Sequence, residues 1–311
     1  MSKQPTDTLP TVFLFPGQGA HTPDMRRMVE LHAPDLCALC EELCDDDPFA
    51  RAAESTRFAQ PAIYCASLAA WRALAHRRAP LALAGHSLGE LSALAAAGAI
   101  TPADGLRLAL KRGALMAEAS ERGEPQGMLA LRAPSAEQLA EICASADLFI
   151  ANRNSPRQVV LAGTLRAIAQ AATAAGELGV RSLTLDVRGA YHTPLMASAV
   201  EPFAAALAQL PISEPKLPVY SCISAAPFVD IRRELARALT TPVSWQRLMA
   251  ELWALGARRL IDVGPGQVLA GLARHCLPDA EICGPSSLLQ QRPGTRQNDG
   301  EQLQEKTFDG R

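Results

Sequence analysis

Residues 85–89 read Gly-His-Ser-Leu-Gly and follow the pattern Gly-x-Ser-x-Gly, which is typical of a serine nucleophile on a sharp turn. An apolar run precedes Ser87 and an alanine-rich segment follows it, so we expect the serine between a strand and a helix. Such a turn lifts the hydroxyl away from the backbone, and amides at the helix start can stabilise an oxyanion. The alternative is a tight structural turn whose serine takes no part in chemistry.

A serine nucleophile needs a general base, and the chain contains six histidines. His86 adjoins Ser87, but neighbouring side chains in such a turn point apart. His192 follows a predicted strand at a predicted junction between domains, where clefts commonly form. His275 lies late in a predicted helix, where it could instead interact with the helix dipole. The residues alone favour His192 as the base and leave His275 open.

The elements that would position these residues alternate between strand and helix in the first part of the chain. The periodicity predicts strands at 10–15 and 81–84 and helices at 25–44, 62–75 (opened by Gln60 and Pro61) and 89–97. This alternation predicts an α/β layer with parallel strands.

The middle of the chain has a different order of predicted strands and helices. Strands are predicted at 127–131, 148–151, 158–162 and 181–187, with helices at 135–145 and 165–178. This β-α-β-β-α-β order is the ferredoxin-like arrangement. Returning strands are expected at 218–221 and 259–263, with a helix at 242–255 between them. We therefore expect a discontinuous α/β core over residues 10–125 and 189–283, a ferredoxin-like subdomain over 126–188, and a disordered polar tail over 284–311.

Composition excludes several classes of protein. The 311 residues carry 30 basic and 32 acidic side chains, so the charge bias that nucleic-acid binding requires is absent. No apolar run approaches the ~20 residues that span a bilayer, and the polar N-terminus lacks the apolar stretch of a signal peptide. Eight cysteines are too few for a disulfide scaffold, and Cys37, Cys40 and Cys44 are expected as buried thiols on one helix face. We expect a cytoplasmic protein without a metal site.

The chain resembles malonyl-CoA:acyl-carrier-protein transacylases and the acyltransferase domains of polyketide synthases. The resemblance is carried by eight blocks in the family's order, at residues 15–19, 60–62, 85–90, 112–116, 154–159, 190–192, 242–245 and 262–266. It implies an α/β-hydrolase-like parallel-sheet core with an inserted ferredoxin-like subdomain. It also implies that Ser87 is the acylated nucleophile and His192 its base, with the backbone amides of Gln18 and Leu88 as the oxyanion hole.

Arg112 points to the class of substrate. It follows Ser87 by 25 residues, which is the family's spacing, and lies on a helix predicted at 103–117. A guanidinium can bind a carboxylate through two parallel hydrogen bonds, so a malonyl-type acyl group is expected. The alternative is a surface arginine beside Lys111 on a solvated helix face. Related monoacyl transferases and acyl-carrier hydrolases lack this arginine.

The resemblance also implies a substrate pocket that includes Gln60, His86 and Tyr191. Malonyl-selective members usually have Phe at the position of Tyr191, and methylmalonyl-selective members have Ser. A large ring here is expected to crowd an α-methyl group and favour malonyl, while its hydroxyl could instead bind a polar α-substituent. The family often has Gln near the position of Ala238, where a main-chain carbonyl orients the base; a carbonyl there can survive the change of side chain.

The sequence thus predicts a free-standing, monomeric acyltransferase acting in trans. Its substrates would be malonyl-CoA and the phosphopantetheine thiol of an acyl carrier protein from fatty-acid or polyketide biosynthesis, with no bound cofactor, nucleic acid or membrane. Two alternatives stay open. One is a hydrolase of acyl-carrier thioesters, which would share Ser87 and His192. The other is a non-catalytic scaffold that docks carrier proteins.

Overall fold

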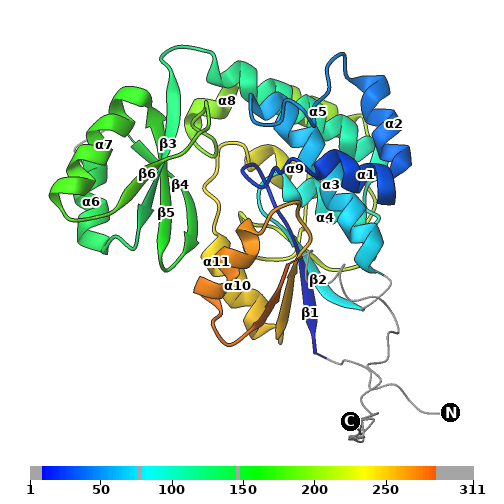
Figure 1. The fold of residues 1–311 in the computed structure, drawn as a ribbon. Helices are drawn as coiled ribbons and strands as arrows, with labels where there is room; N and C mark the ends of the chain where they lie inside the picture. Colours follow the sequence, from blue (N-terminus) through cyan, green and yellow to red (C-terminus); the bar gives the residue numbers. More distant parts are fainter. Residues whose placement is uncertain (1–8, 76–78, 145–147, 285–311) are drawn as a thin grey trace, which may run out of the picture.

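A five-stranded parallel sheet forms the centre of the larger part of the molecule (Figure 1). The computed structural model describes residues 9–75, 79–144 and 148–284. The strand order is β7-β2-β1-β8-β9, and every pairing is parallel. The strands are β1 (Thr11–Phe15), β2 (Pro80–Gly85), β7 (Val219–Tyr220), β8 (Arg259–Asp262) and β9 (Glu281–Cys283).

Helices cover both faces of this sheet, so β1 is buried on both sides. Phe13 and Phe15 enter one apolar cluster, whereas Val12 and Leu14 enter another, as the alternation of side chains along a strand requires. The first cluster is formed mainly with α1 (Met25–His32), α2 (Pro34–Leu43), α3 (Thr56–Leu74), α4 (Gly89–Ala96), α5 (Pro102–Ser120), α8 (Ala197–Ala208) and α9 (Ile231–Arg237). The second is formed with α10 (Trp245–Ala254) and α11 (Val268–Cys276).

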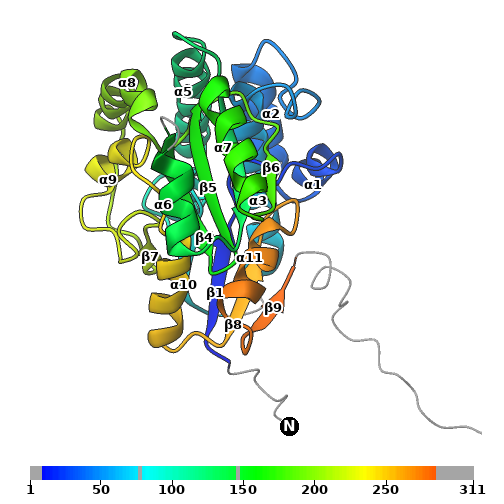
Figure 2. The ribbon, with the colours of Figure 1, turned by 90° about the vertical axis from the view of Figure 1, so that its left-hand side faces the viewer.

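A second, antiparallel sheet lies to one side of this core. Its order is β4-β5-β3-β6, from β3 (Gln126–Arg132), β4 (Leu148–Ser155), β5 (Gln158–Thr164) and β6 (Ser182–Thr184). Helices α6 (Ala136–Ala144) and α7 (Leu165–Glu177) cover its outer face (Figure 2) and share a third apolar cluster with it. The predicted α/β class, with a parallel sheet and a separate ferredoxin-like sheet, is confirmed.

Several predicted boundaries were wrong. The helix predicted at 25–44 is two helices that meet at Ala33, because Pro34 disfavours helical backbone in the residue before it. Helix α3 begins at Thr56, where the Ser55 hydroxyl accepts the Arg57 amide, so Pro61 lies inside the helix and does not open it. Helices α8 and α9 and strand β9 were not predicted. The tail predicted to be disordered lies outside the described residues, apart from Gly284. No helix of the described chain is long and apolar enough to cross a membrane.

Candidate active site

Ser87 lies on the turn between β2 and α4 with a backbone φ of 55°, a conformation that L-residues rarely adopt. The two glycines of the motif make this turn possible. A Cβ at Gly89 would lie 1.9 Å from the Phe15 carbonyl oxygen, and one at Gly85 would lie 2.1 Å from the Glu90 amide nitrogen. Strands β1 and β2 and helix α4 therefore meet too closely for any residue larger than glycine at positions 85 and 89. These two glycines allow Ser87 to adopt its strained conformation.

The structure brings His192 to Ser87 from a segment 105 residues away. The Ser87 hydroxyl lies 2.7 Å from His192 Nε2, and His192 Nδ1 lies 2.7 Å from the Ala238 carbonyl oxygen. If Nδ1–H donates to that carbonyl, Nε2 is free to accept the serine proton. His275, the other candidate base, is exposed on α11 near the end of the helix.

Burial determines the protonation of this histidine. His192 is 4% exposed, and burial lowers its pKa to about 3, with the positive charges of Arg112 and His86 lowering it further. The imidazole is therefore neutral near pH 7 and able to accept a proton.

Arg112 is a buried residue of the site and not a surface arginine. Only 4% of it is exposed, and its guanidinium donates to the Ser87 hydroxyl at 3.0 Å and to Gln60 Oε1 at 2.9 Å. The Gln60 amide in turn donates to the Thr56 hydroxyl at 2.9 Å. Burial lowers the pKa of Arg112 to about 10, so it stays cationic at neutral pH. Within the described residues, two of its five N–H donors are used, and a carboxylate could bind the others.

The backbone amide of Gln18 lies in the loop after β1. The backbone amide of Leu88 lies directly after Ser87, at the start of α4. Gln18 follows β1 in the Gly-rich loop, and Leu88 is the residue before α4. Neither amide donates to another backbone or side-chain group within the described part of the chain. Free N–H groups in such turns suit an oxyanion hole.

Tyr191 and His86 occupy different surroundings. Tyr191 is 6% exposed, and burial raises the pKa of its phenol. Hydrogen bonds with Gln18, Thr56 and Ser120 lower the pKa but do not cancel this rise. The His86 ring points away from the Ser87 hydroxyl: its Nε2 lies 3.0 Å from Asn154 Oδ1, and its ring centre lies 5.1 Å from that of Trp245.

Glu90, which the sequence analysis included in the block 85–90 without giving it a role, places a carboxyl group close to the nucleophile. Glu90 is 1% exposed, and its Oε1 accepts the Ser221 hydroxyl at 2.9 Å and the Cys222 amide at 2.8 Å. Burial raises the pKa of Glu90 to about 7, although these hydrogen bonds and the charge of Arg112 lower it. An acidic residue in an otherwise apolar, alanine-rich helix was the signal that could have identified it.

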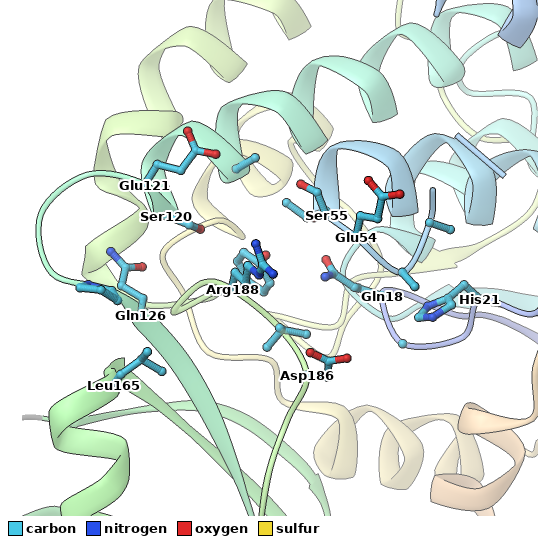
Figure 3. A pocket seen from close by; sticks show the side chains of 18 of the residues that line it. Gln18, His21, Glu54, Ser55, Ser120, Glu121, Gln126, Leu165, Asp186 and Arg188 are labelled. Carbon is cyan, nitrogen blue, oxygen red and sulfur yellow. The ribbon is translucent and has the colours of Figure 1, made fainter. Parts of the chain in front are cut away.

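A cavity of about 630 Å³ lies between the loop after β1, the start of α3, the end of α5 and the antiparallel sheet, and Ser87, Arg112 and His192 are not among the described residues that line it. In Figure 3, Gln126 and Leu165 line the side of the antiparallel sheet, and Glu54 and Ser55 line the opposite side. Gln18 and Tyr191 belong to this lining, and Tyr191 is the residue before His192. Among the described residues, no group of three or more His, Cys, Asp or Glu side chains is placed to hold a metal ion. Cys37 and Cys40 are buried free thiols, and Cys44 is half-buried.

Comparison with known proteins places the chain in a family. The family model described as acyl transferase domain matches residues 40–288. The chain therefore belongs to the acyl transferase domain family, which confirms the resemblance found in the sequence.

Curated relatives are about one third identical to this chain over the aligned residues. The polyketide biosynthesis protein ThaF of Burkholderia thailandensis is 37% identical over 284 residues, which cover 86% of this chain and 24% of that protein. The malonyl CoA-acyl carrier protein transacylase of Salmonella typhimurium is 36% identical over 288 residues, which cover 85% of this chain and 91% of that protein. The chain thus spans about a quarter of the first relative and nearly all of the second.

Solved structures share the fold. The crystal structure of malonyl-CoA:acyl carrier protein transacylase from Xanthomonas oryzae superposes with a TM-score of 0.81 at 33% identity, covering 88% of this chain and 93% of that one. A malonyl-transacylase solved in complex with a type II polyketide synthase acyl-carrier protein gives a TM-score of 0.80 at 29% identity, covering 88% of this chain and 94% of that one.

Proposed function

We propose that this chain transfers a malonyl group from CoA to the phosphopantetheine thiol of an acyl carrier protein, through an acyl-enzyme formed on Ser87. The relatives and solved structures named for this reaction support it over nearly their whole length. The observation that carries the proposal is the buried Arg112, whose guanidinium lies 3.0 Å from the Ser87 hydroxyl. A cation at that distance suits an acyl group that ends in a carboxylate.

The geometry supports a role for each group in the first half-reaction. Arg112 binds the malonyl carboxylate and places the thioester carbonyl over Ser87. His192 Nε2 takes the serine proton as the oxygen attacks, and the amides of Gln18 and Leu88 receive the negative charge of the tetrahedral intermediate. The carbon–sulfur bond then breaks, and the imidazolium returns the proton to the leaving CoA sulfur.

The second half-reaction reverses the first with a different thiol. The phosphopantetheine thiol gives its proton to His192 and attacks the malonyl-Ser87 ester, and the serine oxygen leaves with that proton. The Ala238 carbonyl holds the imidazole throughout, in place of the carboxylate of a Ser-His-Asp triad. These groups supply a nucleophile, a base and charge stabilisation, so we propose that acyl transfer here needs no resident cofactor.

Mass spectrometry tests this function directly. The protein is mixed with malonyl-CoA alone and then with a phosphopantetheine-bearing carrier protein. We expect a malonyl adduct on Ser87 that is absent from Ser87→Ala and that moves to the carrier thiol when the carrier is added. Release of free malonate without labelling of the carrier would instead identify a hydrolase, and absence of any adduct would identify a scaffold.

A further inference from the structure

Glu90 links the nucleophile to a distant segment of the chain. It lies in the first turn of α4, three residues after Ser87, and is 1% exposed. Its Oε1 accepts two hydrogen bonds, from the Ser221 hydroxyl at 2.9 Å and from the Cys222 amide at 2.8 Å. Both donors belong to the segment that follows β7. The carboxyl group therefore fixes that segment against the start of α4.

The same segment returns to the backbone of the nucleophile. The Ser87 amide donates to Cys222 Sγ at 3.3 Å, and the Cys222 carbonyl accepts the Ser244 amide at 2.7 Å. Cys222 is fully buried, so its sulfur is held by packing as well as by these bonds. A buried peptide N–H needs an acceptor, and here the acceptor is a sulfur whose own backbone is anchored by Glu90.

We propose that Glu90 is a positioning residue for acyl transfer: its carboxyl group fixes Cys222, and the Cys222 sulfur holds the Ser87 amide in the turn that aims the hydroxyl at His192. This inference rests on the function proposed above. It assigns Glu90 no contact with the substrate. A turn with a backbone φ of 55° has to be stabilised by its surroundings, and Glu90 contributes to this through its hydrogen bond to the Cys222 amide.

The charge of Glu90 gives the proposal a second consequence. Arg112 on α5 and the Cys222 thiol are the charged or titratable groups whose fields act on it. Strands β1 and β2 carry no ionisable side chain, and the ionisable residues of α3 contact other groups: Arg57 pairs with Glu118, Tyr64 with Pro102, Cys65 with Cys40 and Arg72 with Asp35.

The neutral carboxyl group is the form that suits the reaction. An ionised Glu90 would add a negative charge near the oxyanion and near the substrate carboxylate on Arg112. Burial raises the pKa of Glu90 to about 7, so the neutral form is available at and below that pH. We expect the rate of acylation to fall as the pH rises above about 7, since ionisation then becomes complete.

The experiment measures single-turnover formation of malonyl-Ser87 between pH 5 and pH 9, expressed as a rate constant and a half-saturating malonyl-CoA concentration. Glu90→Ala removes the anchor, and we expect the rate constant to fall about 10²-fold, with half-saturation changed less than about threefold. Glu90→Gln keeps an oxygen acceptor, so it should stay within about tenfold of wild type at pH 6 and lose the decline above pH 7.

Variants at Cys222 test the second link and keep the Glu90 carboxyl group, although they also remove the contact of the thiol with that group. Cys222→Ala removes the acceptor of the Ser87 amide and should slow acylation about tenfold, whereas Cys222→Ser restores an acceptor and should recover part of that loss. Ser135→Ala is the matched control for stability, because it removes the hydroxyl that accepts the Gln138 amide at the start of α6, in the antiparallel-sheet part of the molecule and outside the lining of the cavity. It should lower the thermal midpoint and leave acylation unchanged.

The outcomes separate this inference from the proposed function. If wild type forms no malonyl-Ser87, the function is wrong, and labelling by a serine-reactive fluorophosphonate probe still reports the effect of each variant on the nucleophile. Wild-type rates in Glu90→Ala, or in Cys222→Ala should Glu90→Ala not fold, would overturn the positioning role. A pH profile shared by wild type and Glu90→Gln would overturn the predicted effect of the Glu90 charge.

Discussion

At the scale of single residues, one hydroxyl oxygen connects the charged and titratable groups of the site. Ser87 donates toward His192 at 2.7 Å and accepts from Arg112 at 3.0 Å. The cation beside it helps to keep His192 neutral, because a buried positive charge disfavours a second one. The same arginine therefore favours the basic form of the histidine and, in the proposed function, an anionic end on the acyl group.

Replacing Arg112 with alanine should reverse the preference for a carboxylate. We expect Arg112→Ala to lower kcat/KM for malonyl-CoA by about 10²–10³-fold, because a buried charge pair is worth roughly 2–5 kcal/mol, with little loss for acetyl-CoA. The measurement is the ratio of acylation rates with the two thioesters. Arg107→Ala is the control, since Arg107 lies on the same helix, is half exposed and pairs with Asp104. An unchanged malonyl preference in Arg112→Ala would show that the carboxylate binds elsewhere.

At the scale of elements, the contact between α3 and α5 sets the position of Arg112. Helix α3 carries Gln60 and helix α5 carries Arg112, and their side chains meet at 2.9 Å. The close approach depends on Gly105, where a Cβ would lie 2.0 Å from the Tyr64 hydroxyl oxygen. That hydroxyl donates to the Pro102 carbonyl at 2.9 Å, so it is not free to move aside.

Gly105→Ala should therefore separate the two helices despite the better helix propensity of alanine. We expect a loss of about 1–3 kcal/mol in the free energy of unfolding from overpacking, together with slower acylation. The double variant Gly105→Ala/Tyr64→Phe removes the clashing oxygen but keeps the ring carbon that would lie 2.7 Å from the new Cβ, so it should recover part of the loss. Denaturant titrations of the single and double variants measure the coupling. Strictly additive effects would show that this contact does not set the spacing of the helices.

At the scale of the whole molecule, hydrogen bonds join strand β4 of the antiparallel sheet to the segment before α10 and to the residue before the nucleophile. The Val243 amide donates to the Ala151 carbonyl at 2.9 Å, and the Arg153 amide donates to the Val243 carbonyl at 2.8 Å. Asn154, on the same strand, contacts His86 and also donates to Gln158 at 2.8 Å. The residue before Ser87 is thus tied to the second sheet.

Removal of the Asn154 side chain should affect both stability and reaction rate. Asn154→Ala leaves the His86 ring nitrogen without its partner, so we expect a loss of about 1–3 kcal/mol in the free energy of unfolding and slower acylation of Ser87. Gln158→Ala is the matched control, because it removes the far end of the same chain of bonds and keeps the contact with His86. Chemical denaturation and single-turnover acylation measure both effects. Equal losses in the two variants would contradict a specific role for the His86 contact.

Much of the fold and part of the site could be predicted from sequence because they depend on neighbouring residues. The turn around Ser87 needs only small residues on either side, and the β-α-β-β-α-β order of the middle segment follows from local periodicity. Prediction failed where a local signal was ambiguous: Pro61 reads as a helix start but lies in the second turn of α3. It also failed for short elements such as β9, which has three residues.

The sequence by itself determined the nucleophile turn, the alternation of elements and, through resemblance, the expected partners of Ser87. Only the tertiary structure decided that Arg112 is buried against the serine, that His192 meets it and His275 does not, and that Ala238 provides the carbonyl behind the imidazole. The link from Glu90 through Cys222 to the Ser87 amide joins residues 132 and 135 positions apart. Such contacts form only when the packed sheet brings the ends of β2 and β7 together. They could not be predicted from sequence, because no local pattern encodes which distant segment will pack there.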